Sequence, residues 1–205
     1  PRKGGEGKAL RLSMPPKPDL PIYLATLGEK SLELTGELAD GWLGTSFIPE
    51  RSEVLLDPIR RGAAKAGRSI EDIDIQINAV VAVTDDVEGM LNRARAGMAF
   101  TLGAMGSAKT NFYNAAYSRA GYAEVCMEVQ RLWIEGDRKK AMAAVPDELL
   151  LSAYMIGTED MVRTRIRAFR DAGVNCLRLS PEGKGAKAQI ENLERTMDLI
   201  RSETA

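Results

Sequence analysis

The stretch 21–45 constrains the fold most, because it has the pattern of a strand, a helix and a second strand in close succession. Residues 22–27 form a short apolar run, which is typical of a parallel strand that is buried on both faces. Gly28 breaks this run, and we expect Ser31 to cap the helix that follows. The second strand is expected over 41–48. The stretch therefore predicts a βαβ unit, in which ligands bind after a strand's carboxyl end.

The same alternation continues along the chain. Four strand candidates are each followed by a helical pattern, and they cover 22–27, 41–48, 73–83 and 175–180. A fifth apolar segment, 149–156, is ambiguous between strand and helix. Alternating strands and helices predict a parallel sheet in an α/β fold.

The helices are predicted from their apolar spacing and their end signals. Pro49 is suited to the first position of a helix, and Asp85-Asp86 to capping one over 87–100. The further helices are expected over 122–135, 139–144, 159–172 and a last segment around 190–200. Thr158 is the expected cap of the helix 159–172.

Two segments depart from the strand-helix period. Residues 1–20 are rich in Gly, Pro and Lys, and they predict an extended lead-in. Residues 101–150 begin as an expected loop and continue as short helices, which predicts a helical insertion. A closed eight-stranded barrel typically needs about 250 residues. Four strands plus this insertion predict half of such a barrel, or a small open sheet, as a single domain over 1–205.

Composition excludes several classes of function. The net charge is −1, which predicts neither a nucleic-acid partner nor an anionic membrane partner. No apolar run approaches the roughly 20 residues that span a bilayer. The first residues lack both the apolar core of a secretion signal and an initiator methionine, so we expect a fragment or a processed product.

The cysteine and histidine counts bear on compartment and chemistry. Cys126 and Cys176 are far apart and lie in apolar surroundings, so both are expected to be buried free thiols of a cytoplasmic protein. The chain has no histidine, which removes Ser-His-Asp and Cys-His catalysis and the common zinc sites. No metal site is expected.

Several short blocks together are similar to a known family. In order, the blocks are 21–30, 37–43, 105–107 with 111–113, 144–148, 156–158 and 172–181. Their order and spacing resemble the luciferase-like monooxygenase superfamily, and within it the oxidoreductases that use the deazaflavin coenzyme F420. The resemblance extends from about residue 5 to the end of the chain.

This resemblance implies the C-terminal part of a (β/α)₈ TIM barrel. It implies transfer of a hydride between coenzyme F420 and a small organic substrate. One alternative keeps the fold with FMN as cofactor, in a monooxygenase. Another is a non-catalytic half-barrel that only self-associates. The catalytic acid or base is expected in the part of the family's barrel that precedes these blocks, so no catalytic residue is assigned.

The resemblance also implies where the cofactor binds. Backbone amides at Ala25, Thr26, Leu27 and Gly28 would contact the phosphate-bearing tail of the cofactor. Small residues let the backbone approach a ligand, and the following helix N-terminus favours an anion. The alternative is an ordinary tight turn between strand and helix.

Three further residues are candidates for binding the substrate. Thr45 and Ser46 follow the second strand, where relatives place a hydroxyl toward the pocket; the alternative is a solvated loop. Arg178 lies inside the last strand, where a charge is costly unless it is paired. It would bind an anionic group at the barrel mouth or pair with an acidic neighbour. Four parallel strands leave two open edges, which predict a homo-oligomer.

Overall fold

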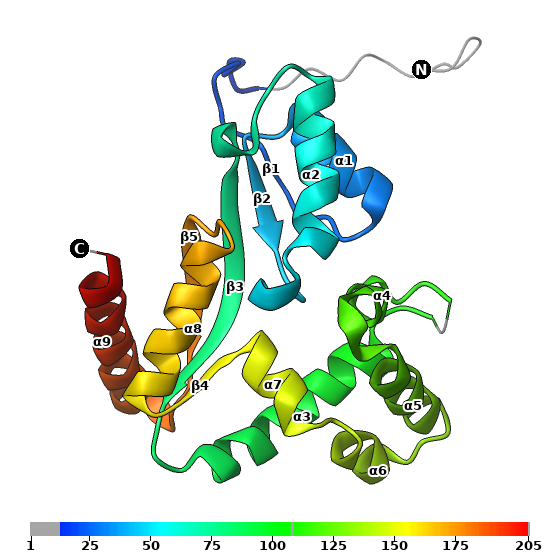
Figure 1. Cartoon of the computed structure of the whole chain (residues 1–205), viewed down its shortest axis with the longest axis vertical. Helices are drawn as coiled ribbons and strands as arrows, with labels where there is room; N and C mark the ends of the chain where they lie inside the picture. The colour runs from blue at the N-terminus through cyan, green and yellow to red at the C-terminus, as the bar shows by residue number, and fades with distance from the viewer. Residues whose placement is uncertain (1–12, 108, 205) are drawn as a thin grey trace.

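The computed structural model describes residues 13–107 and 109–204, and a parallel sheet crosses its centre (Figure 1). The strands are β1 (Tyr23–Leu24), β2 (Gly41–Gly44), β3 (Asp74–Val83), β4 (Met155–Gly157) and β5 (Cys176–Pro181). Every pairing between them is parallel. The predicted α/β fold with a parallel sheet is confirmed.

The longest strand, β3, organises the sheet. Gln76 pairs with Leu43 of β2 and with Cys176 of β5, while Val81 pairs with Met155 of β4 and Pro181 of β5. Because a strand has only two edges, β2 and β4 share one edge of β3 and β5 occupies the other. In the described part of the chain, β1 pairs only with β2, and β4 and β5 pair only with β3, so these three strands each have an open edge.

Four helices cover one face of this sheet: α1 (Glu29–Leu38), α2 (Glu53–Lys65), α8 (Glu159–Asp171) and α9 (Gly185–Thr204). Short 3₁₀ turns, η1 (Pro49–Arg51) and η2 (Ile70–Asp72), flank α2. The largest side chains buried beneath them are Leu32, Trp42, Leu56, Ile59, Ile75, Ile77 and Phe169. Full burial of one such side chain contributes about 1.5–3 kcal/mol, so this layer holds the sheet and its outer helices together.

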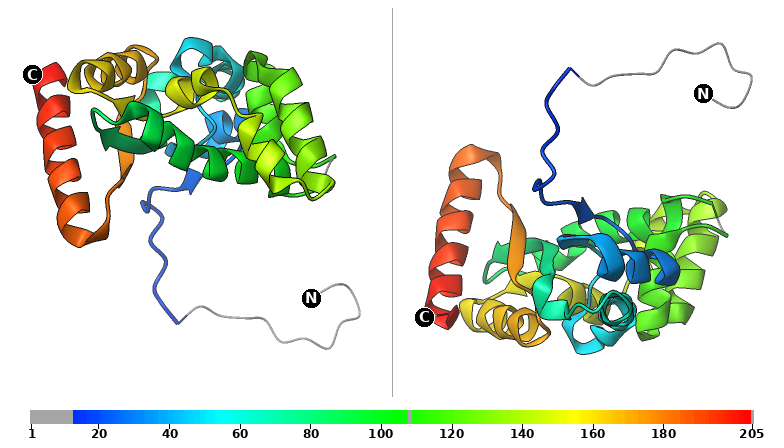
Figure 2. Two further views of the ribbon diagram at one scale, coloured as in Figure 1. Left: turned by 90° about the horizontal axis from the view of Figure 1, so that it is seen from below. Right: turned by 90° about the horizontal axis from the view of Figure 1, so that it is seen from above.

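The chain between β3 and β4 builds a second core. It comprises α3 (Val87–Ala104), α4 (Phe112–Tyr117), the π-helical turn η3 (Ser118–Tyr122), α5 (Ala123–Ile134), α6 (Arg138–Ala143) and α7 (Asp147–Ala153). We refer to α3–α7 as the helical segment. Its buried residues include Met98, Leu102, Cys126, Val129, Leu149 and Leu150. Figure 2 shows α4, α5 and α6 together on one side of the molecule and α9 on the opposite side.

The first helix begins earlier than expected. Gly28 is its N-cap, with extended backbone angles of φ −76° and ψ 143°. Ser31 lies inside the first turn, where its hydroxyl donates to the Gly28 carbonyl at 2.9 Å. The prediction of Ser31 as the cap is therefore wrong, because its side chain is already satisfied within the helix.

Two strands are shorter than predicted. β1 ends at Leu24. Beyond it, the Thr26 carbonyl accepts a hydrogen bond from the indole of Trp42 at 2.9 Å and not from a backbone amide of the neighbouring strand. β2 ends at Gly44, and Ser46 then adopts a left-handed φ of 53°, which turns the chain out of the sheet. The predicted ranges 22–27 and 41–48 therefore include the loops after these strands.

The helical segment corrects two further boundaries. The loop expected from residue 101 begins later, because α3 continues to Ala104 and buries Leu102. Gly103 permits this, since a Cβ there would lie 2.4 Å from the Trp133 side chain. The ambiguous range 149–156 contains both states, the end of α7 and the start of β4.

Other expectations agree with the observed ends. Asp86 accepts from the Gly89 amide at 3.0 Å, and Thr158 accepts from the Met161 amide at 3.5 Å, so both predicted caps are confirmed. Pro49 occupies the first position of a helix, although that helix is the 3₁₀ turn η1. Of the lead-in 1–20, residues 1–12 lie outside the described residues, and 13–20 are exposed and form neither helix nor strand.

Candidate functional site

The face of the sheet opposite α1, α2, α8 and α9 is called the inner face here. Side chains alternate along β3, and buried Ile77 and Ala79 flank exposed Asn78. The parallel register sets Arg178 beside Asn78 and Ser180 beside Val80. The inner face therefore carries polar and charged groups from two adjacent strands.

Arg178 is exposed on this inner face. No ion pair or hydrogen bond of Arg178 occurs within residues 13–107 and 109–204, so the predicted pairing with an acidic neighbour is not found. Its charge instead remains hydrated beside the Asn78 amide. A guanidinium in this state can still bind an anionic group of a ligand.

A first cavity, of about 260 Å³, lies at the carboxyl end of β1. It is called the turn cavity, and its lining residues are Ala25, Thr26, Leu27, Gly28, Ser31, Phe112 and Tyr113. All four residues predicted to bind the cofactor thus line one cavity. None of the seven lining side chains carries a charge at neutral pH, so no carboxylate of the lining would repel an anion.

The polar groups around the turn cavity divide into engaged and free ones. The Thr35 hydroxyl donates to the Ser31 carbonyl and lies 2.7 Å from the Thr26 hydroxyl, so Thr26 is the donor of that pair. The carbonyl of Leu27 accepts from Arg119 at 2.9 Å. The first amides of α1 have no partner within the helix, and an anion near them gains roughly 0.3–1 kcal/mol.

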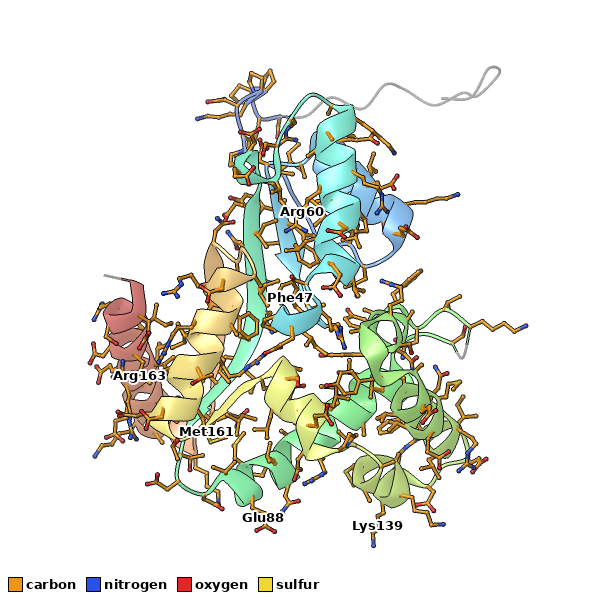
Figure 3. The ribbon with its side chains drawn as sticks, viewed as in Figure 1. Phe47, Arg60, Glu88, Lys139, Met161 and Arg163 are labelled. Atoms are coloured by element: carbon orange, nitrogen blue, oxygen red, sulfur yellow. The ribbon has the colours of Figure 1, made fainter. Side chains whose placement is uncertain are left out.

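A second cavity, of about 160 Å³, lies beyond the carboxyl end of β2. It is called the hydroxyl cavity, and its lining residues are Thr45, Ser46, Phe47, Asn78, Val80, Thr101, Tyr117, Ala153 and Tyr154. The two predicted hydroxyl residues, Thr45 and Ser46, lie on it together. Figure 3 shows Phe47, one of its walls, near the centre of the molecule between β2 and α7.

Ser46 is an unusual residue in this cavity. It is 6% exposed, and its Oγ has no hydrogen-bond partner within the described part of the chain. Its φ of 53° is in the left-handed region, which costs a residue with a Cβ about 1–2 kcal/mol. A buried hydroxyl without a partner costs a further amount of about 1–3 kcal/mol. Such combined costs are concentrated at ligand-binding positions.

Two phenols complete the polar lining. Burial raises the pKa of Tyr117 far above its ordinary value, and the nearby Tyr154 raises it further, while the hydroxyl of Ser46 acts against the rise. Burial also raises the pKa of Tyr154 to about 12. Both phenols therefore remain protonated at neutral pH and can donate hydrogen bonds.

The sequence did not indicate these phenols. Tyr117 belongs to α4, in the part of the chain expected to begin as a loop, and Tyr154 follows α7. No residue spacing connects them with β2, because they reach the cavity through the packing of the helical segment. Only the position of Thr45 and Ser46 after a strand was predictable.

A third cavity, of about 540 Å³, separates the ends of β3 and β5 from α3 and α9. Its charged lining residues are Arg93, Glu182, Lys184, Glu191 and Arg195. Arg195 pairs with Glu159 at 2.7 Å, and Arg93 lies 3.9 Å from Asp86. Because both signs are present and two of the three cations, Arg93 and Arg195, have acidic partners nearby, this cavity has no selective charge.

The two cysteines differ in burial. Cys126 is fully buried, which raises its pKa to about 11, whereas Cys176 is only half-buried on the inner face. The prediction of a buried Cys176 is wrong, because helices cover only the other face of β5. Within residues 13–107 and 109–204, no cluster of three acidic or cysteine side chains could hold a metal ion. None of the described helices is long and apolar enough to cross a bilayer.

This open parallel sheet, with cavities beyond the ends of its strands, defines an α/β protein of the TIM-barrel type. The family model for luciferase-like monooxygenases matches residues 5–176. The chain belongs to this family.

Individual relatives agree with the family. A Mycobacterium tuberculosis protein described as "Putative coenzyme F420-dependent oxidoreductase" is 33% identical over 192 residues, which are 92% of this chain and 54% of the relative. The 5,10-methylenetetrahydromethanopterin reductase of Archaeoglobus fulgidus is 32% identical over 84% of this chain and 52% of its own. The chain thus spans about half the length of these relatives.

A solved structure shows the same fold. The coenzyme F420-dependent tetrahydromethanopterin reductase from Methanopyrus kandleri superposes with a TM-score of 0.64 at 24% sequence identity. The match covers 91% of this chain and 50% of that enzyme. The chain therefore has the fold of part of a luciferase-like TIM barrel.

Proposed function

We propose that this chain belongs to an oxidoreductase that transfers a hydride between coenzyme F420 and a small organic substrate. The observation that carries the proposal is the turn cavity. Four residues expected to hold the cofactor's tail line it together, beside the first turn of α1. The Mycobacterium tuberculosis relative is described as coenzyme F420-dependent, which supports this cofactor, and the Archaeoglobus fulgidus relative is described as a reductase, which supports the class of reaction.

The fit between the turn cavity and a phosphate-bearing tail is physical. The cavity lining is uncharged, the amides of the α1 N-terminus lack helical partners, and Gly28 limits the bulk of the wall. Coenzyme F420 would supply the hydride chemistry when bound. The residues of this chain would hold its tail by backbone amides and exclude water around it with Phe112.

The substrate would lie at the carboxyl ends of β2 and β5. Thr45 and Ser46 would contact it from the hydroxyl cavity, and Arg178 from the inner face. We further propose a cytoplasmic homo-oligomer, because β1, β4 and β5 each have an open edge within the described residues. The partner is a small molecule rather than a nucleic acid or a membrane, in keeping with the net charge of −1.

Two alternatives share the fold. FMN also carries a phosphate, so the turn cavity could hold it in a monooxygenase of the kind after which the family is named. A half-barrel without catalysis would bind neither cofactor and would only self-associate. Cofactor titration separates all three.

The test is an equilibrium titration of the 205-residue chain with coenzyme F420 and, in parallel, with FMN, followed by fluorescence. Light scattering measures the mass in the same samples. The proposal predicts saturable binding of coenzyme F420 that is stronger than that of FMN. Stronger binding of FMN would establish the first alternative, and binding of neither by an oligomer would establish the second.

A variant that adds a negative charge tests the location of the cofactor site. Gly28→Asp adds a carboxylate to the turn cavity; its Cβ would lie 3.3 Å from the Ser31 Oγ, a tight contact with the end of a side chain, and 3.9 Å from a Phe112 ring carbon. We expect cofactor binding to weaken at least about ten-fold, since a like charge a few ångströms from a phosphate costs more than 1 kcal/mol. Gly97→Asp, on the exposed side of α3, is the matched control and should leave binding unchanged. Equal effects of the two variants would contradict the assignment of the turn cavity.

A further inference from the structure

The hydroxyl cavity has a composition that selects among ligands. Its nine lining residues include five with a side-chain hydroxyl and one amide, and no side chain in it is charged at neutral pH. The hydroxyl-bearing residues are Thr45, Ser46, Thr101, Tyr117 and Tyr154. A carboxylate, phosphate or ammonium inside it would lose hydration without gaining a counter-charge, whereas a neutral oxygen loses little.

Part of the hydrogen-bonding capacity inside the cavity is not used by the protein. The Thr101 hydroxyl donates to the Gly97 carbonyl at 2.9 Å, so it is engaged elsewhere. Ser46 is more than nine-tenths buried, and its hydroxyl makes no hydrogen bond of good geometry among the described residues, although it lies close enough to the Tyr117 phenol to lower the pKa of that group. Tyr117 is 4% exposed and is beside it. Two hydroxyls thus line the cavity together without a well-formed hydrogen bond between them.

The location agrees with a ligand site. Asn78 and Val80 reach the cavity from the inner face of β3, and Thr45 and Ser46 come directly after β2. Ligands of parallel α/β folds bind beyond the carboxyl ends of such strands. Apart from Phe47, the remaining walls come from the helical segment and the residue after it, which gives this long connection a role in forming the site.

We propose that the hydroxyl cavity binds an uncharged oxygen of the substrate, a carbonyl or a hydroxyl, through donors on Ser46 and Tyr117. The substrate class is therefore a small neutral carbonyl compound or alcohol at its reacting end. Ser46 and Tyr117 hold that oxygen and thereby orient the neighbouring carbon. That the bound molecule is the substrate rests on the proposed function, whereas the cavity and its donors do not depend on it.

The test uses a matched pair of probes, acetamide and acetate, which have nearly the same shape and differ in charge. Saturation-transfer NMR on the 205-residue chain reports contact with each probe, without any cofactor. We expect a saturable signal from acetamide and none from acetate. Ser46→Ala and Tyr117→Phe should each weaken acetamide binding about five-fold, the effect of losing one hydrogen bond.

Two controls make the outcome decisive. Tyr122→Phe removes a phenol that bonds Ser152 at 3.3 Å outside the cavity, and it should leave acetamide binding unchanged. Ser46→Gly removes the hydroxyl without the left-handed strain, so weaker binding in a well-folded variant separates recognition from folding. Equal signals from acetamide and acetate, or no effect of Tyr117→Phe, would overturn the proposal, and the cavity would then be a site for water only. Because no cofactor is present, this result is independent of the F420 titration.

Discussion

Ser46 combines backbone strain and an unsatisfied hydroxyl in a single residue. Its φ of 53° is the only positive φ of a non-glycine residue within 13–107 and 109–204. The left-handed conformation turns the chain from β2 toward η1 and presents the hydroxyl to the cavity. A residue that stabilised the fold alone would be expected to avoid both costs.

The strain at Ser46 can be measured. Ser46→Gly should be more stable than Ser46→Ala by about 1 kcal/mol, because only alanine retains a Cβ in the left-handed conformation. Both variants lack the hydroxyl, so the difference isolates the backbone. Urea unfolding followed by circular dichroism gives the two free energies of unfolding. Equal values would mean that position 46 is not left-handed in solution.

The two thiols should react differently. Cys126 is fully buried with a pKa raised to about 11, so almost no thiolate is present or accessible at pH 8. Cys176 is half-buried on the inner face. We expect iodoacetamide to label Cys176 first, and Cys126 only in denaturant, as judged by peptide mass spectrometry. Labelling of both at one rate in the native chain would contradict the burial of Cys126.

Sequence reasoning reached the candidate sites only where position along a strand was enough. Ala25 to Gly28 and Thr45-Ser46 follow strands, and each group lines a cavity. Tyr117 and Tyr154 were not predictable, because their approach to Ser46 depends on how α4 and α7 pack. A buried cysteine and a half-exposed one also have the same sequence pattern. Whether a face of the sheet is covered depends on which other elements pack on it, and the residues next to the cysteine do not show this.

At the scale of elements, α1 and α2 are packed through glycines. A Cβ on Gly36 would lie 2.0 Å from the Ile59 carbonyl oxygen, and one on Gly62 would lie 1.8 Å from the Glu33 carbonyl oxygen. Both contacts involve backbone, which cannot move aside as a side chain could. The close approach of these two helices, and not helix propensity, therefore explains glycine at both positions.

Alanine at these glycines should destabilise the protein. Gly36→Ala and Gly62→Ala are each expected to lower the free energy of unfolding by about 1–3 kcal/mol, because the helices must separate. Gly97→Ala in α3 is the control, since a Cβ there meets nothing within 4 Å. It should raise stability by about 0.5–1 kcal/mol through helix propensity. Thermal unfolding measures all three, and a neutral Gly62→Ala would refute the close packing.

Charges also join α1 to α2. Glu33 accepts from Lys65 at 2.7 Å and from Arg61 at 3.0 Å, and these bonds hold its pKa below the ordinary 4.5. Its contribution to stability is therefore present above about pH 4.5 and is lost as the pH falls through the lower folded pKa. This ion pair is at the surface, so it adjusts the packing of the helices rather than causing it.

The pH dependence of Tm tests this pair. Glu33→Gln should lower Tm at pH 7, and the difference from the native chain should shrink as the pH falls below 4.5. Glu29→Gln, which removes a more exposed partner of Arg61, is the control and should have a smaller effect. A difference that stays constant from pH 7 to the acid range would show that Glu33 acts by packing instead of charge.

For the whole molecule, the period of strands and helices predicted half of a barrel or a small open sheet, and only the family resemblance selected the barrel, which the family match and the structural neighbour confirm. The period could not predict β4, because a three-residue strand has no pattern of its own. It also could not show that β4 continues the edge of β3 beyond β2. That arrangement depends on the route of the helical segment back to the sheet.

The inner face of the sheet is a candidate surface for the association of two copies. Leu43, Gln76 and Cys176 form one row across this face and are half-buried, while Asn78 and Arg178 in the next row are exposed. If two copies associate through their inner faces, Cys176 becomes covered. The rate at which iodoacetamide labels Cys176 should then fall as the protein concentration rises through the dissociation constant measured by light scattering. Association through another surface would leave that rate independent of concentration, and the inner face would then not be the homo-oligomer interface.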